Sequence, residues 1–165
     1  MKLFKNIKKW LENQEHLFYL FLLILIVPNI ILCFTEPMPV VAKVCNVLLP
    51  FAFYYLLMTL SRNCGKMFWI LFLFIFFGAF QIVLLYLFGQ SIIAVDMFLN
   101  LVTTNSSEAM ELLDNLVPAL VSVIILYIPA LILAAISIIK KRKLSPEFIR
   151  RERKKAWIAL LIGFI

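Results

Sequence analysis

Four polar side chains recur at steps of four residues in the segment of residues 89–116: Asp96, Asn100, Thr104 and Glu108. Residues four apart lie on the same face of a helix, so this spacing predicts a polar ridge. A carboxylate and neutral hydrogen-bonding groups of this kind can together bind a small polar ligand that carries a positive charge. The same residues would also suit a solvated loop, so spacing alone leaves both interpretations open.

A second geometry fits the same segment. Asn105 or Ser106 can cap the start of a helix, and Glu108 then lies where a capping box has its acidic residue. In that case two short helices on the outer face meet at Thr104 and Asn105. In both geometries the side chains of Asn100, Thr104 and Glu108 can converge on one side.

The stretch NLVTTNSSEAMELL, residues 100–113, resembles the outer-loop signature of the lipid A phosphoethanolamine transferases, the colistin-resistance type of enzyme in the alkaline phosphatase and sulfatase superfamily. In that family an Asn, a Thr-Asn pair and a Glu-Ala pair, at successive steps of four, form part of the donor-lipid pocket. The resemblance implies substrate-binding roles for Asn100, Thr104 and Glu108. It also implies secondary contacts from Asp96 and Asn105.

The resemblance implies an enzyme that moves phosphoethanolamine from phosphatidylethanolamine to lipid A and so confers polymyxin resistance. Its zinc and Thr nucleophile would belong to an outward-facing catalytic domain absent from this chain. We therefore expect no catalytic residue, no metal site and no activity in this piece alone. Two alternatives stay open: the membrane domain of a glycerol-phosphate polymerase of the same superfamily, and a small non-catalytic polytopic membrane protein.

The composition predicts that membrane helices flank this segment and position its residues. Hydrophobic residues make up 64% of the chain, charged residues 15%, and the mean hydropathy is +1.03, outside the usual range of soluble domains. A spanning helix needs about 20 mainly apolar residues. The sequence predicts an all-α bundle of five transmembrane helices, at about residues 16–34, 40–60, 67–88, 117–139 and 156–165. The fifth is too short to cross, so we expect the natural protein to continue.

The cations predict the orientation. Fifteen of the sixteen Lys and Arg residues lie in three segments, namely residues 2–9, 61–66 and 140–155, and only Lys43 lies elsewhere. Cationic residues near span ends are retained in the cytoplasm. An even number of predicted spans separates the three segments. The cations therefore predict a multi-pass protein with a cytoplasmic N-terminus and with segment 89–116 outside. Together with the resemblance, this implies a protein of the inner membrane whose segment 89–116 is periplasmic.

The basic run KKRKLSPEFIRRERKK, residues 140–155, is the one place where a nucleic acid could bind. Between two predicted spans, such a run is typical of a topology anchor that also meets anionic lipid. We therefore expect the bilayer, and no nucleic acid, as its partner. Within it, Ser145 and Pro146 predict a turn or a helix start.

The remaining chemistry-bearing residues give weaker signals. Apart from Lys43, near an outer end, no predicted span carries an acidic or basic residue, which disfavours an ion or proton pathway. His16 is the only histidine, and no Cys or His pair has metal-ligand spacing. Cys33 and Cys45 flank the first outer loop, where a disulfide is conceivable; the sequence does not decide whether they pair.

Overall fold

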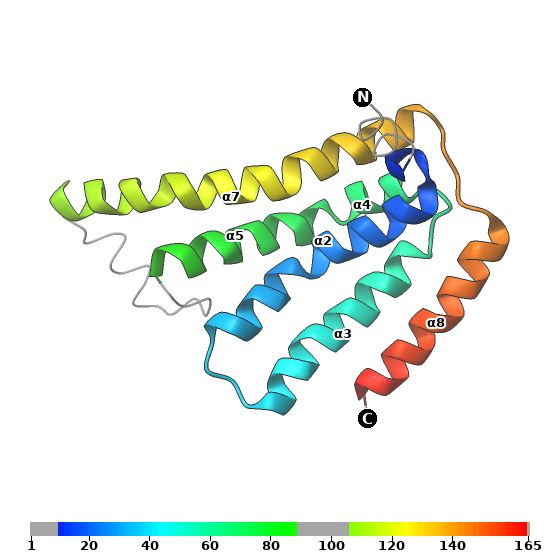
Figure 1. Ribbon diagram of the computed structural model, residues 1–165, viewed down its shortest axis with the longest axis horizontal. Helices are drawn as coiled ribbons and strands as arrows, with labels where there is room; N and C mark the ends of the chain where they lie inside the picture. The colour runs from blue at the N-terminus through cyan, green and yellow to red at the C-terminus, as the bar shows by residue number, and fades with distance from the viewer. Residues whose placement is uncertain (1–9, 89–105, 165) are drawn as a thin grey trace.

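The computed structural model describes residues 10–88 and 106–164, and every regular element within these ranges is a helix. The elements are α2 (Gln14–Thr35), α3 (Val40–Met58), α4 (Cys64–Ile70), α5 (Phe72–Phe88), α7 (Ser106–Ile139) and α8 (Pro146–Phe164) (Figure 1). The predicted all-α class is thus confirmed for the described part of the chain.

The helices form a row in which α2, α4, α5 and α8 run away from one end of the bundle and α3 and α7 run toward it (Figure 1). In space the order is α8, α3, α2, the α4–α5 pair and α7, with each helix packed on its neighbours in the row. Consequently α2, α4 and α8 all begin at one end of the bundle, where α3 and α7 finish. We call this the basic end, because residues 59–66 and 140–146 lie there together with the start of α2.

Three helix starts at the basic end have side-chain caps. Asn13 accepts a hydrogen bond from the Glu15 amide (2.9 Å), Asn63 from the Lys66 amide (2.8 Å), and Ser145 from the Phe148 amide (3.1 Å). Such caps satisfy amides that have no partner inside the helix. Of the two alternatives predicted for Ser145 and Pro146, a turn or a helix start, the structure shows the helix start.

Within the described ranges, three helices are long and apolar enough to cross a membrane: α2, α3 and residues Val117–Ile139 of α7. A fourth candidate exists if α4 and residues Phe72–Val83 of α5 count as one bent span. Large apolar side chains also face outward, including Phe72, Leu73, Phe76 and Phe77 on α5. Such a surface suits lipid rather than water. A five-span bundle is not confirmed, because α8 does not meet the criteria for a membrane span.

The predicted third span, residues 67–88, is not one straight helix. It breaks at Leu71, and α4 and α5 meet at an angle of 62°. Residues 67–75 contain neither Pro nor Gly, the usual causes of a sharp kink. Both halves pack on α7, so the break follows from tertiary packing and had no local signal in the sequence.

The ends of the fourth and fifth predicted spans also differ from expectation. α7 is continuous from Ser106, so residues 106–116 extend the fourth span instead of forming a separate outer-face helix. α8 begins at Pro146, ten residues before the predicted start at residue 156, because the basic run itself is helical. Its second half lies beside the middle of α3, since Gly163 packs near Leu48 and Leu49.

The best-packed part of the core lies toward the basic end. Phe21 of α2 stacks on Phe68 of α4 with ring centres 4.4 Å apart, and both are fully buried. Phe18 meets Phe148 of α8 edge to face at 5.4 Å. This core joins α8 firmly to the bundle and so fixes the direction in which its charged side chains point.

Candidate functional site

Most of the predicted outer site lies outside the described residues. This applies to Asp96, Asn100, Thr104 and Asn105, which belong to the segment 89–105. Glu108 is the third helical residue of α7, and its side chain is not among those the structure describes. The helix start at Ser106 agrees with the capping geometry, in which Asn105 precedes the helix and Glu108 is three residues further on. The convergence of the ridge residues stays a prediction.

At the basic end, a polar junction joins the α3–α4 loop to the segment after α7. The Leu144 amide donates to the Arg62 carbonyl (2.7 Å), and the Arg62 Nε donates back to the Leu144 carbonyl (3.1 Å). The Asn63 amide group donates to the carbonyls of Ser137 (3.3 Å) and Arg142 (2.9 Å). These bonds close the bundle between residues about 80 positions apart in the sequence.

The start of α2 joins the same end. Arg142 donates to the Glu12 carbonyl (3.3 Å) and lies 3.7 Å from the Glu12 carboxylate. Gln14 Oε1 accepts a hydrogen bond from Ser137 of α7 at 2.7 Å. Of the three basic segments predicted to share one face of the membrane, the two that the structure describes, residues 61–66 and 140–155, are joined at this end of the molecule. The third, residues 2–9, lies outside the described residues.

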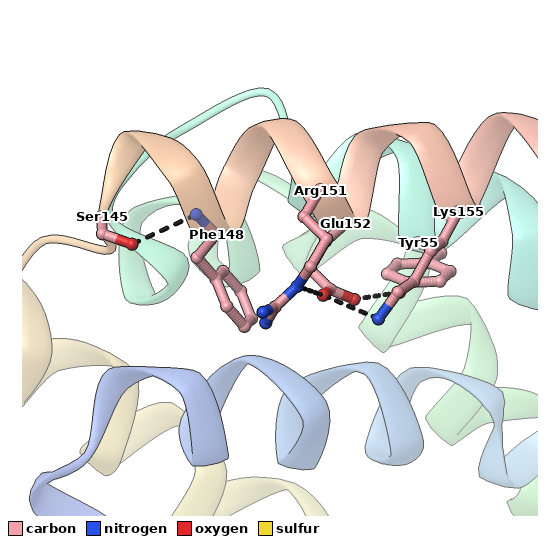
Figure 2. A network of polar contacts seen from close by, with 6 residues as sticks. All are labelled: Tyr55, Ser145, Phe148, Arg151, Glu152 and Lys155. Atoms are coloured by element: carbon pink, nitrogen blue, oxygen red, sulfur yellow. Dashed lines mark hydrogen bonds and ion pairs between the residues drawn. The ribbon is translucent and has the colours of Figure 1, made fainter.

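A buried carboxylate is the feature that the sequence analysis missed. Glu152 of α8 is fully buried and accepts a hydrogen bond from the hydroxyl of Tyr55 on α3. Its other oxygen accepts bonds from Arg151 (2.8 Å) and Lys155 (3.0 Å), whose side chains are about half exposed (Figure 2). The network holds the charged part of α8 against α3.

The electrostatics of this network keep Glu152 ionised. Burial by itself would raise the pKa of its carboxyl group, but hydrogen bonds from Tyr55, Arg151 and Lys155 outweigh burial and lower that pKa to about 2. A carboxylate with this set of partners is a structural anion. It is a poor proton carrier at neutral pH because it stays ionised throughout the physiological range.

A helical pattern could have revealed Glu152. Phe148, Glu152 and Ala156 recur at steps of four, and all three are buried in α8. An acidic residue in line with two apolar ones marks a buried face on an amphipathic helix. The surrounding cations conceal this pattern, because the whole run of residues 140–155 has the composition of a topology anchor.

At the opposite end, α2 and α3 are joined by neutral polar groups. The side-chain amide of Asn46 donates to the Asn29 carbonyl (2.9 Å), and the Asn29 amide donates to Asn46 Oδ1 (3.2 Å). Cys33 donates to the Lys43 carbonyl (3.3 Å) and is a free thiol, as is Cys45, so they form no disulfide in this structure. An apolar groove of about 540 Å³ beside them runs between α2 and α3.

No group of three or more His, Cys, Asp or Glu residues within ranges 10–88 and 106–164 is arranged to hold a metal ion. His16 stacks on Trp10 with ring centres 4.9 Å apart at the start of α2. Comparison of the chain with known protein families, curated protein sequences and solved structures finds no match.

Proposed function

We propose that this chain is the membrane domain of a phosphoethanolamine transferase of the inner membrane, and that it seats the donor lipid phosphatidylethanolamine. The observation that carries the proposal is the outer-loop signature, in which Asn100, the pair Thr104-Asn105 and the pair Glu108-Ala109 follow one another at steps of four. Lipid A is the proposed acceptor.

The arrangement of α7 supports this proposal. A helix of 34 residues is about 50 Å long, whereas the hydrocarbon core of a bilayer is about 30 Å thick. α7 ends at the basic end, so its first turns lie at the opposite end and extend past the end of α5 (Figure 1). With the basic end in the cytoplasm, Glu108 would lie at the outer surface of the membrane, where the donor headgroup is found.

The chemistry of the three ridge residues suits the donor. The Glu108 carboxylate would accept hydrogen bonds from the ammonium group, and Asn100 and Thr104 would contribute neutral hydrogen bonds to the rest of the headgroup. In this proposal the chain binds and orients the lipid. Phosphoryl transfer belongs to an outward domain that supplies zinc and a Thr nucleophile, which is why no catalytic residue is assigned here.

A lipid competition tests the proposal. The chain is placed in nanodiscs with equal amounts of phosphatidylethanolamine, phosphatidylglycerol and phosphatidylcholine, and the retained lipids are counted by native mass spectrometry. We expect enrichment of phosphatidylethanolamine. Glu108→Gln should lower that enrichment about tenfold, because a charge-assisted hydrogen bond contributes about 1.5–3 kcal/mol. Gln is equally good in a capping box, so this substitution separates ammonium binding from helix capping.

Glu111→Gln provides the matched control, because it makes the same change one turn further along α7 and off the predicted ridge. An equal effect of both substitutions, or no enrichment in the unsubstituted chain, would refute a donor site at Glu108. A preference for phosphatidylglycerol that depends on the ridge residues would favour the glycerol-phosphate polymerase. For the intact protein, mass spectrometry of lipid A from expressing cells should show added phosphoethanolamine.

A further inference from the structure

A pocket of about 400 Å³ opens at the basic end between the α3–α4 loop and α8. Its lining includes four cations, Arg62, Arg150, Arg153 and Lys154, together with the indole of Trp157. None of the described residues that line the pocket is acidic. Four positive charges around one hollow form a site for an anion.

Folding of α8 creates this concentration of charge by separating its ionic groups. Arg150, Arg153, Lys154 and Trp157 are spaced three, four and seven residues apart and so share one face of the helix. Glu152 points away from that face toward Tyr55 and is paired with other cations of the same helix (Figure 2). The nearest carboxylate in sequence therefore does not neutralise the pocket.

Two of the guanidinium groups are held by neutral acceptors. Arg62 Nε donates to the Leu144 carbonyl (3.1 Å), and Arg153 Nη2 donates to the Thr59 carbonyl (2.6 Å). Backbone carbonyls orient an Arg side chain without cancelling its charge. Both groups are thus positioned in advance and keep the remaining N–H donors of their forks for a ligand, which suits a phosphate oxygen.

The pocket lies at the polar end of an apolar surface. Beyond Trp157, α8 exposes Ile158, Leu161 and Ile162, and each of these side chains is more than half exposed. Trp residues are enriched where a membrane meets water. A ligand with its phosphate among the cations would therefore have apolar surface directly beneath it, as a phospholipid requires and a free phosphate or a nucleic acid does not.

We propose that this pocket binds the phosphodiester headgroup of an anionic phospholipid in the leaflet at the basic end. The phosphate contacts Arg62, Arg150, Arg153 and Lys154, and the acyl chains lie along Trp157 and the exposed apolar residues of α8. The inference uses only described residues and is independent of the outer loop. It gives the chain a second lipid site at the other membrane surface. This site prefers an anionic headgroup, whereas the proposed donor site prefers a zwitterionic one.

Titration of the full chain tests this site. The protein in a neutral detergent is titrated with phosphatidylglycerol, with phosphatidylcholine and with inorganic phosphate, and bound molecules are counted by native mass spectrometry. We expect tight binding of one phosphatidylglycerol that weakens as salt is added. Phosphatidylcholine should bind much more weakly, and millimolar phosphate should not displace the lipid.

Two double variants locate the lipid-binding site on the protein. The double variant Arg150→Gln with Lys154→Gln should weaken phosphatidylglycerol binding by about tenfold to thirtyfold, since each cation near an anionic surface contributes about 1 kcal/mol. Lys140→Gln with Lys143→Gln removes the same charge from exposed positions outside the pocket and should have little effect. Trp157→Ala should weaken lipid binding without any loss of positive charge.

The possible outcomes separate this site from the outer one. Equal loss in the two double variants would overturn the proposal, because it would show attraction to net charge instead of a pocket. Binding of inorganic phosphate that competes with the lipid would also overturn it. Glu108→Gln should leave phosphatidylglycerol binding unchanged, so failure of the donor site and failure of this site give different results.

Discussion

Glu152 is a buried carboxylate on a helix whose neighbouring residues are mainly cations, and its hydrogen-bond partners come from other helices as well as its own. Tyr55 is the partner on α3, so the pair connects residues 97 positions apart in the sequence. Removing one member of a buried charged network leaves the others without partners, which destabilises more than the net contribution of the intact contact would suggest.

We predict that Glu152→Ala lowers the free energy of unfolding by about 1–3 kcal/mol, because the buried Tyr55 hydroxyl loses its acceptor. Arg151 and Lys155 are half exposed and can turn to water, which limits the loss. Thermal unfolding in detergent measures the effect. Glu147→Ala, at an exposed position of the same helix, should change stability by less than about 1 kcal/mol. An equal shift in the two variants would contradict the structural role of Glu152.

The lowered pKa of Glu152 predicts a pH dependence. A carboxyl group with a pKa of about 2 when folded, against a usual value of 4.5, stabilises the fold fully above about pH 4.5. That stabilisation should fall progressively as the pH drops from about 4.5 to 2. Over this range the free energy of unfolding should depend more steeply on pH for the unsubstituted chain than for Glu152→Gln, because the Gln side chain does not titrate. Parallel curves would show that other acids control acid unfolding.

At the scale of elements, α4 and α7 approach each other closely at Gly65. A Cβ atom added at Gly65 would lie 2.3 Å from the Ala134 carbonyl oxygen and 2.9 Å from Ser137 Cβ. Backbone atoms cannot move aside cheaply, so Gly is required for this approach. Small residues at such contacts are typical of helix packing in membranes, where backbones come close together.

Gly65→Ala should therefore separate α4 from α7 and destabilise the protein by about 1–3 kcal/mol, the usual range for overpacking. Gly163→Ala is the matched control. A Cβ atom added at Gly163 would lie 3.0 Å from Cδ2 of Leu49, which is the flexible end of a side chain. Ala is also favoured over Gly in a helix by about 1 kcal/mol, so the control should be neutral or slightly stabilising. Similar unfolding temperatures for the two variants would refute the packing argument.

The sequence predicted some elements well because a single local cause determines them. The limits of α2 and α3 follow from apolar runs interrupted at Glu36 and Pro39, and the start of α8 follows from Ser145. The break at Leu71 and the burial of Glu152 depend on contacts with α7 and α3, and neither contact has a local signature. The candidate outer site is still a prediction from its sequence motif, because only Glu108 among its residues belongs to a described helix.

For the whole molecule, the junction of Arg62 with Leu144 constrains the number of membrane crossings. The two residues bond to each other, so an even number of crossings separates them. α7 contains one candidate span, and the α4–α5 pair is the other candidate among the described residues between Arg62 and Leu144. A crossing by the bent α4–α5 pair, in place of a re-entrant loop, would give the even number.

Topology reporters measure this directly. Fusions at Asn63 and at Ser145 should behave as cytoplasmic, and a fusion at Asn105 as exported, because cations near span ends are retained inside. A re-entrant α4–α5 would instead give a cytoplasmic reporter at Asn105. An exported reporter at Ser145 would contradict the position of the basic end in the cytoplasm.

The junction at the basic end also determines an order of assembly. Residues 59–63 leave the ribosome well before residues 137–144 have been made, and N-terminal parts of a chain fold first. During this interval α2 and α3 can already pair, since their contacts need nothing from α7. Until then the loop between α3 and α4 is exposed to water, which forms hydrogen bonds with its polar groups. The two loops join only when α7 has inserted, so closure of this end follows the pairing of α2 with α3 and leaves α8 still to pack on α3.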